Sequence, residues 1–376
     1  METIERWIGN IYRHLHRNPE LGGHEAQTQS YLSDKLEELG IPVTVYEGQH
    51  ALVGLIQGAY PGVTAAVRAE MDALPIMERT GLSYASAYPG IMHACGHDAH
   101  MAIVLGAARL LMEDRHNMRG NVKLLFEPDE EVIGGGKDMV AAGCLENPHV
   151  AGVLSLHMNP AFDTGVVYSK AGPVSGMSTD IHITVTGKSC HAAYPERGVD
   201  AVLIAAQIIV SLQTIVSRSV SPFDNAVLSM GEIHGGTASN IVCGSVLLHG
   251  TLRVLYPEQE ACLREKITVM CRSVASAFGG TADVAFASGY RSVCNDPVLH
   301  GYLERRAGTL ITRPAPSLGV ESFCFFINNI PGLHYDLGCG IGSPIHTDTF
   351  QIDETVLMTG ARLQAQLLND ILDGGI

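Results

Sequence analysis

Hydrophobic and polar positions along the chain alternate in patterns that predict a succession of helices and strands. Amphipathic spacing predicts helices over residues 4–17 and 25–39, the second ended by Gly40 in the usual C-terminal position. Short apolar runs over 51–57, 63–69, 122–126 and 150–156 predict buried strands. A helix over 98–112 and another ending at Ala142 separate the later strands. This alternation is typical of a layered α/β domain with a mixed sheet.

The pattern changes over residues 178–289. Strands are predicted at 180–186, 226–233, 245–253 and 281–287, with helices at 199–218 and 258–277. This β-α-β-β-α-β order resembles a ferredoxin-like α+β unit. From about residue 290 the α/β pattern resumes, and it ends in a helix over 353–372. We therefore predict two domains, residues 1–177 plus 290–376 and an inserted domain over 178–289, as a chain of 376 residues favours.

Charge and cysteine content narrow the class of protein. The net charge of −15 argues against binding to nucleic acid or to an anionic membrane. The uncharged stretch 201–217 is short for a membrane span and is flanked by Asp200 and Arg218, so we expect a buried or interface helix. Nine irregularly spaced cysteines and a charged, helix-like start without a secretory signal predict a reduced, cytoplasmic protein.

The segment His93-Ala-Cys-Gly-His-Asp-Ala-His100 concentrates candidate metal ligands. Three histidines, one cysteine and one aspartate fall within eight residues. Imidazole, thiolate and carboxylate groups are the ligands that hold zinc and similar divalent ions. The alternative is a helix start that happens to be rich in histidine, because the spacing is not one of the named zinc signatures.

Further candidates lie where predicted strands end. Ligands of open α/β sheets bind at the carboxyl ends of strands, and loops that precede helices converge at the same place. A single histidine there is more often structural than a ligand, but the set supplies ligands for one or two metals. The set comprises Asp72, Cys95, His97, Glu130, Glu131, His157 and His346.

The adjacent carboxylates Glu130 and Glu131 have two interpretations. Such a pair usually lies on a solvated face, because the two charges repel. Beside a metal the pair divides the work: one carboxylate binds the ion and its neighbour takes a proton from the attacking water. The apolar strand before the pair and the glycines after it favour the second interpretation.

Together, motifs in order from about residue 10 to 355 resemble one known group. They are similar to the amidohydrolase branch of the aminoacylase/carboxypeptidase metallopeptidase superfamily, with hippurate hydrolases, N-acyl-amino-acid deacetylases and plant auxin-conjugate hydrolases. The motifs are Asn18-Pro-Glu-Leu-Gly22, Met71-Asp-Ala-Leu-Pro-Ile76, His93-Ala-Cys-Gly-His-Asp98, Glu130-Glu131 with Gly134-Gly-Gly136, His157-Met158, Gly187-Lys-Ser-Cys-His-Ala192, Gly235-Gly-Thr-Ala-Ser-Asn240 and Gly250-Thr-Leu-Arg253.

The resemblance implies a metal-dependent hydrolase of N-acyl, above all N-acetyl, amino acids. It implies two divalent ions (zinc, manganese, cobalt or nickel) in the catalytic domain, and an inserted domain that serves as a lid and forms a homodimer. It implies that Glu130 is the general base and acid, and that His191 stabilises the oxyanion. The implied metal ligands are Cys95, His97, Glu131, His157 and His346; Asp72 and Asp98 orient them; Asn240 and Arg253 bind the substrate carboxylate.

Three positions depart from the pattern of the branch. The branch usually has Asp where this chain has Glu70, Gln where it has Glu127, and Asp where it has Ser322. We expect these changes to alter substrate range rather than the chemistry. Two other interpretations stay open: a dipeptidase or carboxypeptidase of the same superfamily, which usually has Asp in place of Cys95, and a metal-binding protein without catalysis, which has no need of a base at Glu130.

Overall fold

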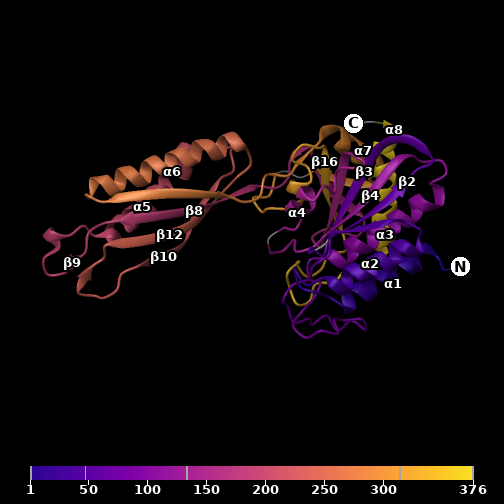
Figure 1. The fold of residues 1–376 in the computed structure, drawn as a ribbon, viewed down its shortest axis with the longest axis horizontal. Helices are drawn as coiled ribbons and strands as arrows, with labels where there is room; N and C mark the ends of the chain where they lie inside the picture. The colour runs from indigo at the N-terminus through magenta and orange to yellow at the C-terminus, as the bar shows by residue number, and fades with distance from the viewer. Residues whose placement is uncertain (1, 47, 133, 313–314, 375–376) are drawn as a thin grey trace. The chain divides into compact units, whose positions relative to one another are not determined.

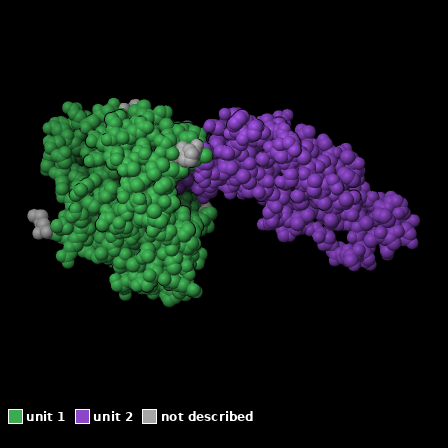
Figure 2. All heavy atoms as spheres, turned by 180° about the vertical axis from the view of Figure 1, so that it is seen from behind, with its two compact units in different colours: residues 1–174, 294–315, 322–376 green, residues 175–293, 316–321 purple. Residues whose placement is uncertain are grey.

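The structure, a computed structural model, describes residues 2–46, 48–132, 134–312 and 315–374. The chain divides into two compact units, coloured separately in Figure 2. Unit 1 comprises residues 1–174, 294–315 and 322–376, and unit 2 comprises 175–293 and 316–321. The predicted inserted domain, 178–289, starts and ends inside unit 2. The short return at 316–321 has no sequence signal of its own, since it forms neither helix nor strand.

Unit 1 is built on one eight-stranded mixed sheet (Figure 1). The centre of this sheet is formed by four strands that run parallel to one another, β4, β3, β5 and β16. In order across the sheet the strands are β1 (Val43–Val45), β2 (Leu52–Gln57), β4 (Arg119–Glu127), β3 (Tyr60–Glu70), β5 (Val150–Asn159), β16 (Gly332–Gly338), β6 (Val166–Ser169) and β15 (Thr309–Thr312).

Helices cover the two faces of this sheet unequally. The main core packs α1 (Ile4–Arg17), α2 (Ala26–Glu38), α3 (His97–Asp114), α7 (Pro297–Arg306) and α8 (Thr355–Gly374) against one face. The other face carries the short α4 (Gly136–Ala141) and a 3-10 turn at Ser322–Phe325. Because side chains alternate along a strand, Val67 and Ala69 of β3 enter the main core while Arg68 and Glu70 face α4 and the turn.

Most of these elements agree with the hydrophobic pattern. Helix 4–17 is α1, and the apolar runs at 51–57, 63–69, 122–126 and 150–156 lie in β2, β3, β4 and β5. The pattern did not predict β6, β15 or α7. β6 and β15 are only four residues long, and α7 and β15 bury few of their residues, so the three elements offer little of the periodicity from which elements are recognised.

Unit 2 is a four-stranded antiparallel sheet with two helices on one face. Its chain order, β8 (Met177–Thr186), α5 (Ala201–Ser219), β10 (Val227–Gly235), β12 (Ser245–Val254), α6 (Pro257–Ala277) and β13 (Thr281–Ser288), is the predicted β-α-β-β-α-β order. The spatial order β10-β12-β8-β13 is that of a ferredoxin-like sheet. The chain also forms two short antiparallel strand pairs. β9 (Cys190–His191) pairs with β11 (Ile241–Val242), and β7 (Gly172–Pro173) pairs with β14 (Cys294–Asn295).

Helix α5 has one buried and one exposed side. Asp200 caps its start by accepting hydrogen bonds from the backbone N–H groups of Val202 and Leu203. Among the described residues, it is the one helix long and apolar enough to cross a membrane by length and composition. Its buried side packs into the core of unit 2 through Ala201, Ile204, Ala205, Ile208, Leu212 and Ile215.

Candidate metal centre and active site

Chemistry-bearing side chains gather where the central strands of unit 1 end. Since β3, β4, β5 and β16 run in the same direction, their carboxyl ends meet at one edge of the sheet. His157 lies inside β5, close to its end, whereas the sequence pattern predicted it as the terminal residue. The residues brought to this edge are Asp72, Cys95, His97, Glu130, Glu131, His157 and His346.

Donor atoms of four of these residues surround the sulfur of Cys95. This sulfur lies 3.3 Å from His157 Nε2 and 3.3 Å from His346 Nε2. His346 Nε2 is also 3.0 Å from Glu131 Oε1. The donor atoms of Cys95, His97 and His157 lie within 4.8 Å of one another. One thiol, three imidazoles and one carboxylate therefore converge on a small volume.

Backbone hydrogen bonds orient two of the imidazole rings. His97 Nδ1 lies 2.9 Å from the carbonyl oxygen of Asp72, and His157 Nδ1 lies 2.9 Å from that of Met158. Because a carbonyl only accepts, each Nδ1 carries a proton, and each Nε2 is directed toward the cluster. His97 Nε2 is buried and, within the described parts of the chain, has no hydrogen-bond partner. This is the geometry of an imidazole prepared to bind a metal.

The charges around Cys95 favour its thiolate. Burial alone would raise the pKa of the thiol, but His157 and His97 lower that pKa to about 6. Hydrogen bonds to Cys95 and Glu131 in turn raise the pKa of His346 to about 10. The thiolate is the form that binds metals, so the donor set suits a cation at neutral pH.

Two backbone positions with positive φ shape the loops of the cluster. Gly96 has φ 90°, and a Cβ there would lie 3.0 Å from the side chain of Met158, so only glycine fits before α3. His346 has φ 61°, which is unfavourable for a residue with a side chain. A 2.7 Å hydrogen bond from its backbone N–H to the carbonyl of Ala94 holds this conformation. Strain of this kind is typical of functional sites.

Asp72 joins two of the candidate ligands. Its Oδ2 accepts a 2.9 Å hydrogen bond from the backbone N–H of Glu131, and its Oδ1 lies 3.3 Å from His97 Nδ1. Burial would raise the pKa of this carboxyl, but the bonds from His97 hold the pKa below its usual value. Asp72 thus contacts two candidate ligands, and its orienting role stays a prediction.

Glu130 lies beside the candidate ligands His97 and Glu131. Its carboxylate belongs to a group with His97 and Glu131 whose donor atoms lie within 4.8 Å of one another. Its Oε1 lies 3.4 Å from the backbone nitrogen of Ser322, and 4.0 Å from Nη2 of Arg68. About 16% of the side chain is exposed, so water reaches it.

Asp98 contacts a different partner from the one expected. Instead of orienting a ligand, its Oδ2 lies 2.6 Å from Nδ1 of His16 in α1, whose Nε2 lies 3.2 Å from Glu78. Burial opposes charge on this ring, but Asp98 and Glu78 raise the pKa of His16 to about 9. The contact therefore ties the start of α3 to α1 through a buried ion pair.

The sequence did not reveal which buried polar residues contact Glu70. His100 Nδ1 lies 2.8 Å from Glu70, while its Nε2 accepts a hydrogen bond from the backbone of Met158. Burial lowers the pKa of His100 to about 4, so the ring is neutral and links Glu70 to the backbone of Met158. Arg68, a lone cation in an apolar strand, bonds Glu70 as well. The one signal of Arg68 in the sequence is a charged residue inside an apolar run that predicts a buried strand.

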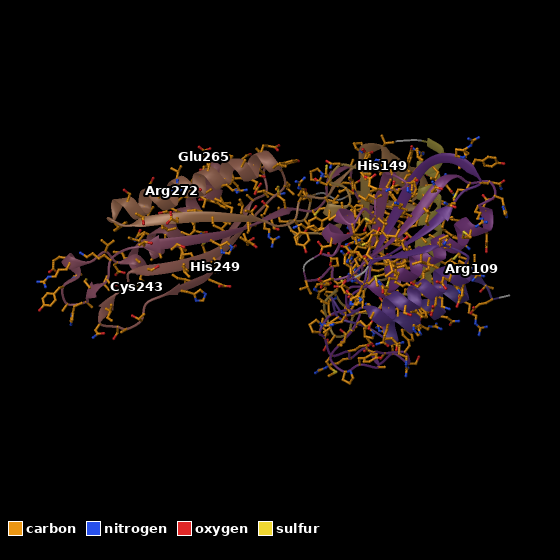
Figure 3. The ribbon with its side chains drawn as sticks, in the orientation of Figure 1. Arg109, His149, Cys243, His249, Glu265 and Arg272 are labelled. Carbon is orange, nitrogen blue, oxygen red and sulfur yellow. The ribbon has the colours of Figure 1, made fainter. Side chains whose placement is uncertain are left out.

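The remaining predicted residues belong to unit 2. His191 and Asn240 lie close together: His191 pairs with Ile241 across β9 and β11, and the Asn240 carbonyl accepts a hydrogen bond from Ala192. Arg253 lies near the end of β12, a strand that begins at Ser245. At 3.3 Å per residue, Arg253 is about 25 Å from Ser245 along the strand. Because side chains alternate along the strand, Arg253 faces the same side of the sheet as His249, which Figure 3 labels, and away from the buried Leu252 and Val254. Within unit 2, Arg253 is thus separate from the other two.

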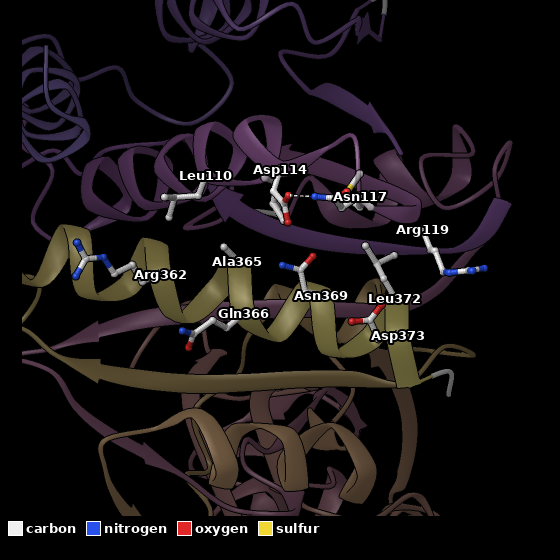
Figure 4. Close-up of a pocket in the computed structure, with 12 residues that line it drawn as sticks. Leu110, Asp114, Asn117, Arg119, Arg362, Ala365, Gln366, Asn369, Leu372 and Asp373 are labelled. Carbon is white, nitrogen blue, oxygen red and sulfur yellow. Dashed lines mark hydrogen bonds between the residues drawn. The ribbon is translucent and has the colours of Figure 1, made fainter. Parts of the chain in front are cut away.

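A separate surface hollow contains none of these residues (Figure 4). It measures about 340 Å³ and lies between the ends of α3 and α8, lined by Asp114, Arg362 and Asn369 among others. His97 starts α3 and Asp114 ends it, so at 1.5 Å per residue the two lie about 25 Å apart. The hollow is not part of the metal-ligand cluster.

Comparison with known proteins gives consistent matches over nearly the whole chain. The profile of peptidase family M20/M25/M40 matches residues 66–370. N-acetyl-L-cysteine deacetylase of Bacillus subtilis (strain 168) is 35% identical, over 99% of this chain and 90% of that protein. Thermostable carboxypeptidase 2 of Saccharolobus solfataricus is 34% identical, over 98% of this chain and 96% of that protein. The crystal structure of the Bacillus subtilis YXEP protein, a dinuclear metal-binding M20 peptidase, matches with TM-score 0.88 and 28% identity, over 98% and 99%.

Proposed function

The chain belongs to peptidase family M20/M25/M40, and on this basis we propose that it is a metal-dependent amidohydrolase of N-acyl amino acids. The proposed reaction cleaves the amide bond and releases a carboxylic acid and a free amino acid. One observation carries the proposal: five soft and hard donors converge, and the carboxylate of a sixth residue, Glu130, lies beside them.

The donor set fits divalent ions. The buried Nε2 of His97, which has no hydrogen-bond partner among the described residues, and the lowered pKa of Cys95 are both features of ligands that a cation completes. We propose that two ions are held by Cys95, His97, Glu131, His157 and His346. A thiolate with imidazoles suits zinc, cobalt or nickel, and the carboxylate also accepts manganese. When bound, such ions polarise the amide carbonyl and make water a stronger acid.

Residues of the chain then move the proton. We propose that the Glu130 carboxylate takes the proton of the attacking water and returns it to the leaving amine nitrogen. Asp72 keeps His97 and Glu131 in place during this transfer through its two oxygens. From unit 2, the resemblance assigns His191 to the oxyanion and Asn240 and Arg253 to the substrate carboxylate, and these roles stay proposals.

The test is release of free amine from a panel of N-acyl amino acids. The panel carries acetyl, benzoyl and longer acyl groups on sulfur-containing, dibasic and aromatic amino acids. Protein reconstituted with zinc, manganese, cobalt or nickel is compared with the same protein after chelation. We expect turnover at a rate of about 1–10³ s⁻¹ on the best substrate, abolished by the chelator and restored by the metal.

Absence of turnover with metal bound would contradict the proposal. Carboxypeptidase activity is the second candidate, because a carboxypeptidase is among the relatives of similar identity. Dipeptides and N-blocked peptides are therefore included in the same panel. Faster release from free dipeptides than from N-acyl amino acids would favour this second candidate, and turnover that survives chelation would exclude metal dependence for either.

We also propose that the chain forms a homodimer through the exposed side of α5. Val202, Leu203 and Val210 are 44%, 47% and 66% exposed there, which is unusual for large apolar side chains on one helix. Changing Val210→Glu should yield a folded monomer, whose mass is measured by light scattering after size exclusion. The control Val298→Glu, at a valine that is 50% exposed on α7 of unit 1, should leave the mass unchanged. A dimer mass for Val210→Glu would contradict the proposal.

A further inference from the structure

A second charged cluster, distinct from the metal ligands, surrounds Arg68. This residue is among the largest fully buried side chains of the protein. Its Nε donates to Glu127, its Nη1 to Glu70 and its Nη2 to the hydroxyl of Ser322. Ser155 Oγ lies 3.5 Å from Nη1. A buried guanidinium is tolerated only with such compensation, since an uncompensated buried charge costs several kcal/mol.

Strand register places two carboxylates against this one cation. Glu70 of β3 is paired with Glu127 of β4, and Arg68 precedes Glu70 by two residues on the same face. Burial would raise the pKa of Glu70, but Arg68 and His100 hold that pKa well below its usual value. The positions that depart from the family pattern, 70, 127 and 322, thus all contact one guanidinium.

Glu127 closes the loop that carries the base. One of its oxygens binds Arg68 and the other accepts a 2.6 Å hydrogen bond from the backbone N–H of Gly136, at the start of α4. A Cβ at Gly136 would lie 2.7 Å from that oxygen, so only glycine allows this approach. Glu130 and Glu131 lie in the loop between these two anchor points.

Ser322 forms the other link to the base. Its hydroxyl accepts the hydrogen bond from Arg68 Nη2, while its backbone N–H points to Oε1 of Glu130 at 3.4 Å. The same oxygen of Glu130 lies 4.0 Å from Arg68 Nη2. Arg68 therefore reaches Glu130 by two routes, through the loop closed by Glu127 and through Ser322.

We propose that Arg68 is a positioning residue for Glu130, and that its second carboxylate is supplied interchangeably from position 127 or position 322. In this chain Glu127 supplies it and Ser322 is neutral. An aspartate at 322 would place a carboxylate on Nη2, the atom that now binds the Ser322 hydroxyl. The statement about Glu130 rests on the proposed function; the statement about the exchange rests on the contacts of Arg68 alone.

The test is a double-mutant cycle with Glu127→Gln, Ser322→Asp and both together. The first leaves Arg68 one carboxylate, the second gives it three, and the double variant restores two. We expect each single change to lower kcat about tenfold and to lower the Tm, and the double variant to return kcat to within about threefold of the parent. KM and bound metal should stay unchanged, because the ligands are not touched.

Controls separate positioning from folding. Ser322→Ala removes the acceptor of Arg68 and should lower kcat with a folded protein, even if Glu127→Gln is insoluble. Ser169→Ala removes another fully buried hydroxyl of unit 1, bonded to His334 and Asn295, and should leave kcat unchanged. Losses in kcat that simply multiply in the double variant, or a kcat for Ser322→Ala equal to the parent, would overturn the positioning role.

The Tm values of the double-mutant cycle are measured without substrate, so they test the exchange independently of the proposed function. If no N-acyl amino acid is hydrolysed, the proposed function fails while the Tm values still decide the exchange. Recovery of Tm in the double variant supports the interchange of positions 127 and 322. Tm losses that add without recovery overturn it.

Discussion

Glu130→Gln is expected to lower kcat by about 10²–10⁴-fold while the protein keeps its metal. The amide has the size of the carboxylate and can still accept the hydrogen bond from Ser322, so the loop should keep its place. It has no basic oxygen, however, and so takes no proton from water. Steady-state kinetics on the best substrate, with metal content measured on the same sample, provide the check.

The adjacent carboxylate gives a matched control for this result. Glu131 faces His346 at 3.0 Å, so Glu131→Gln should lose metal as well as activity. Loss of metal in Glu130→Gln would make Glu130 a ligand and leave the reaction without an identified base. Parent-like turnover in that variant would remove Glu130 from the mechanism.

Cys95→Ser should weaken metal binding by about 100-fold or more, and turnover should fall with it. The Cys95 thiol, with its pKa near 6, ionises at neutral pH, whereas a serine hydroxyl does not. The sulfur also lies between His157 and His346 at 3.3 Å from each, so one change disturbs both sides of the cluster. Competition titration against a chelator measures the Kd.

A buried thiol elsewhere in the protein serves as the control. Cys271 lies in the core of unit 2, where burial raises the pKa of its thiol to about 12 and keeps it protonated. Cys271→Ser should change the Tm but not the metal Kd. A metal Kd for Cys95→Ser equal to that of the parent would exclude Cys95 as a ligand.

Strand periodicity predicted where the candidate ligands would gather. Asp72, Glu130 and His157 lie after or near the ends of buried strands, and parallel strands bring such positions to one edge whatever the details of packing. The structure shows these residues together with Cys95 and His346. Their roles as ligands and base stay predictions that the variants above test.

Pairwise contacts across the sheet could not be predicted in the same way. That Arg68 meets Glu127 depends on the register of β3 against β4, and a shift of one residue would turn Arg68 to the main core. Asp98 meets His16 because α1 packs on α3, a contact between residues 82 positions apart. No local pattern encodes such a choice, since it follows from the packing of the whole unit.

The position of β16 in the sheet has a consequence for synthesis of the protein. β5 pairs with β3 on one side and with β16 on the other, yet about 170 residues, including all of unit 2, are made between β5 and β16. At roughly 5–20 residues per second, the second edge of β5 stays open for on the order of 10–35 s. An open apolar strand edge is a template for wrong pairing. Nascent chains are thus most exposed to aggregation, and most in need of chaperones, during the translation of unit 2.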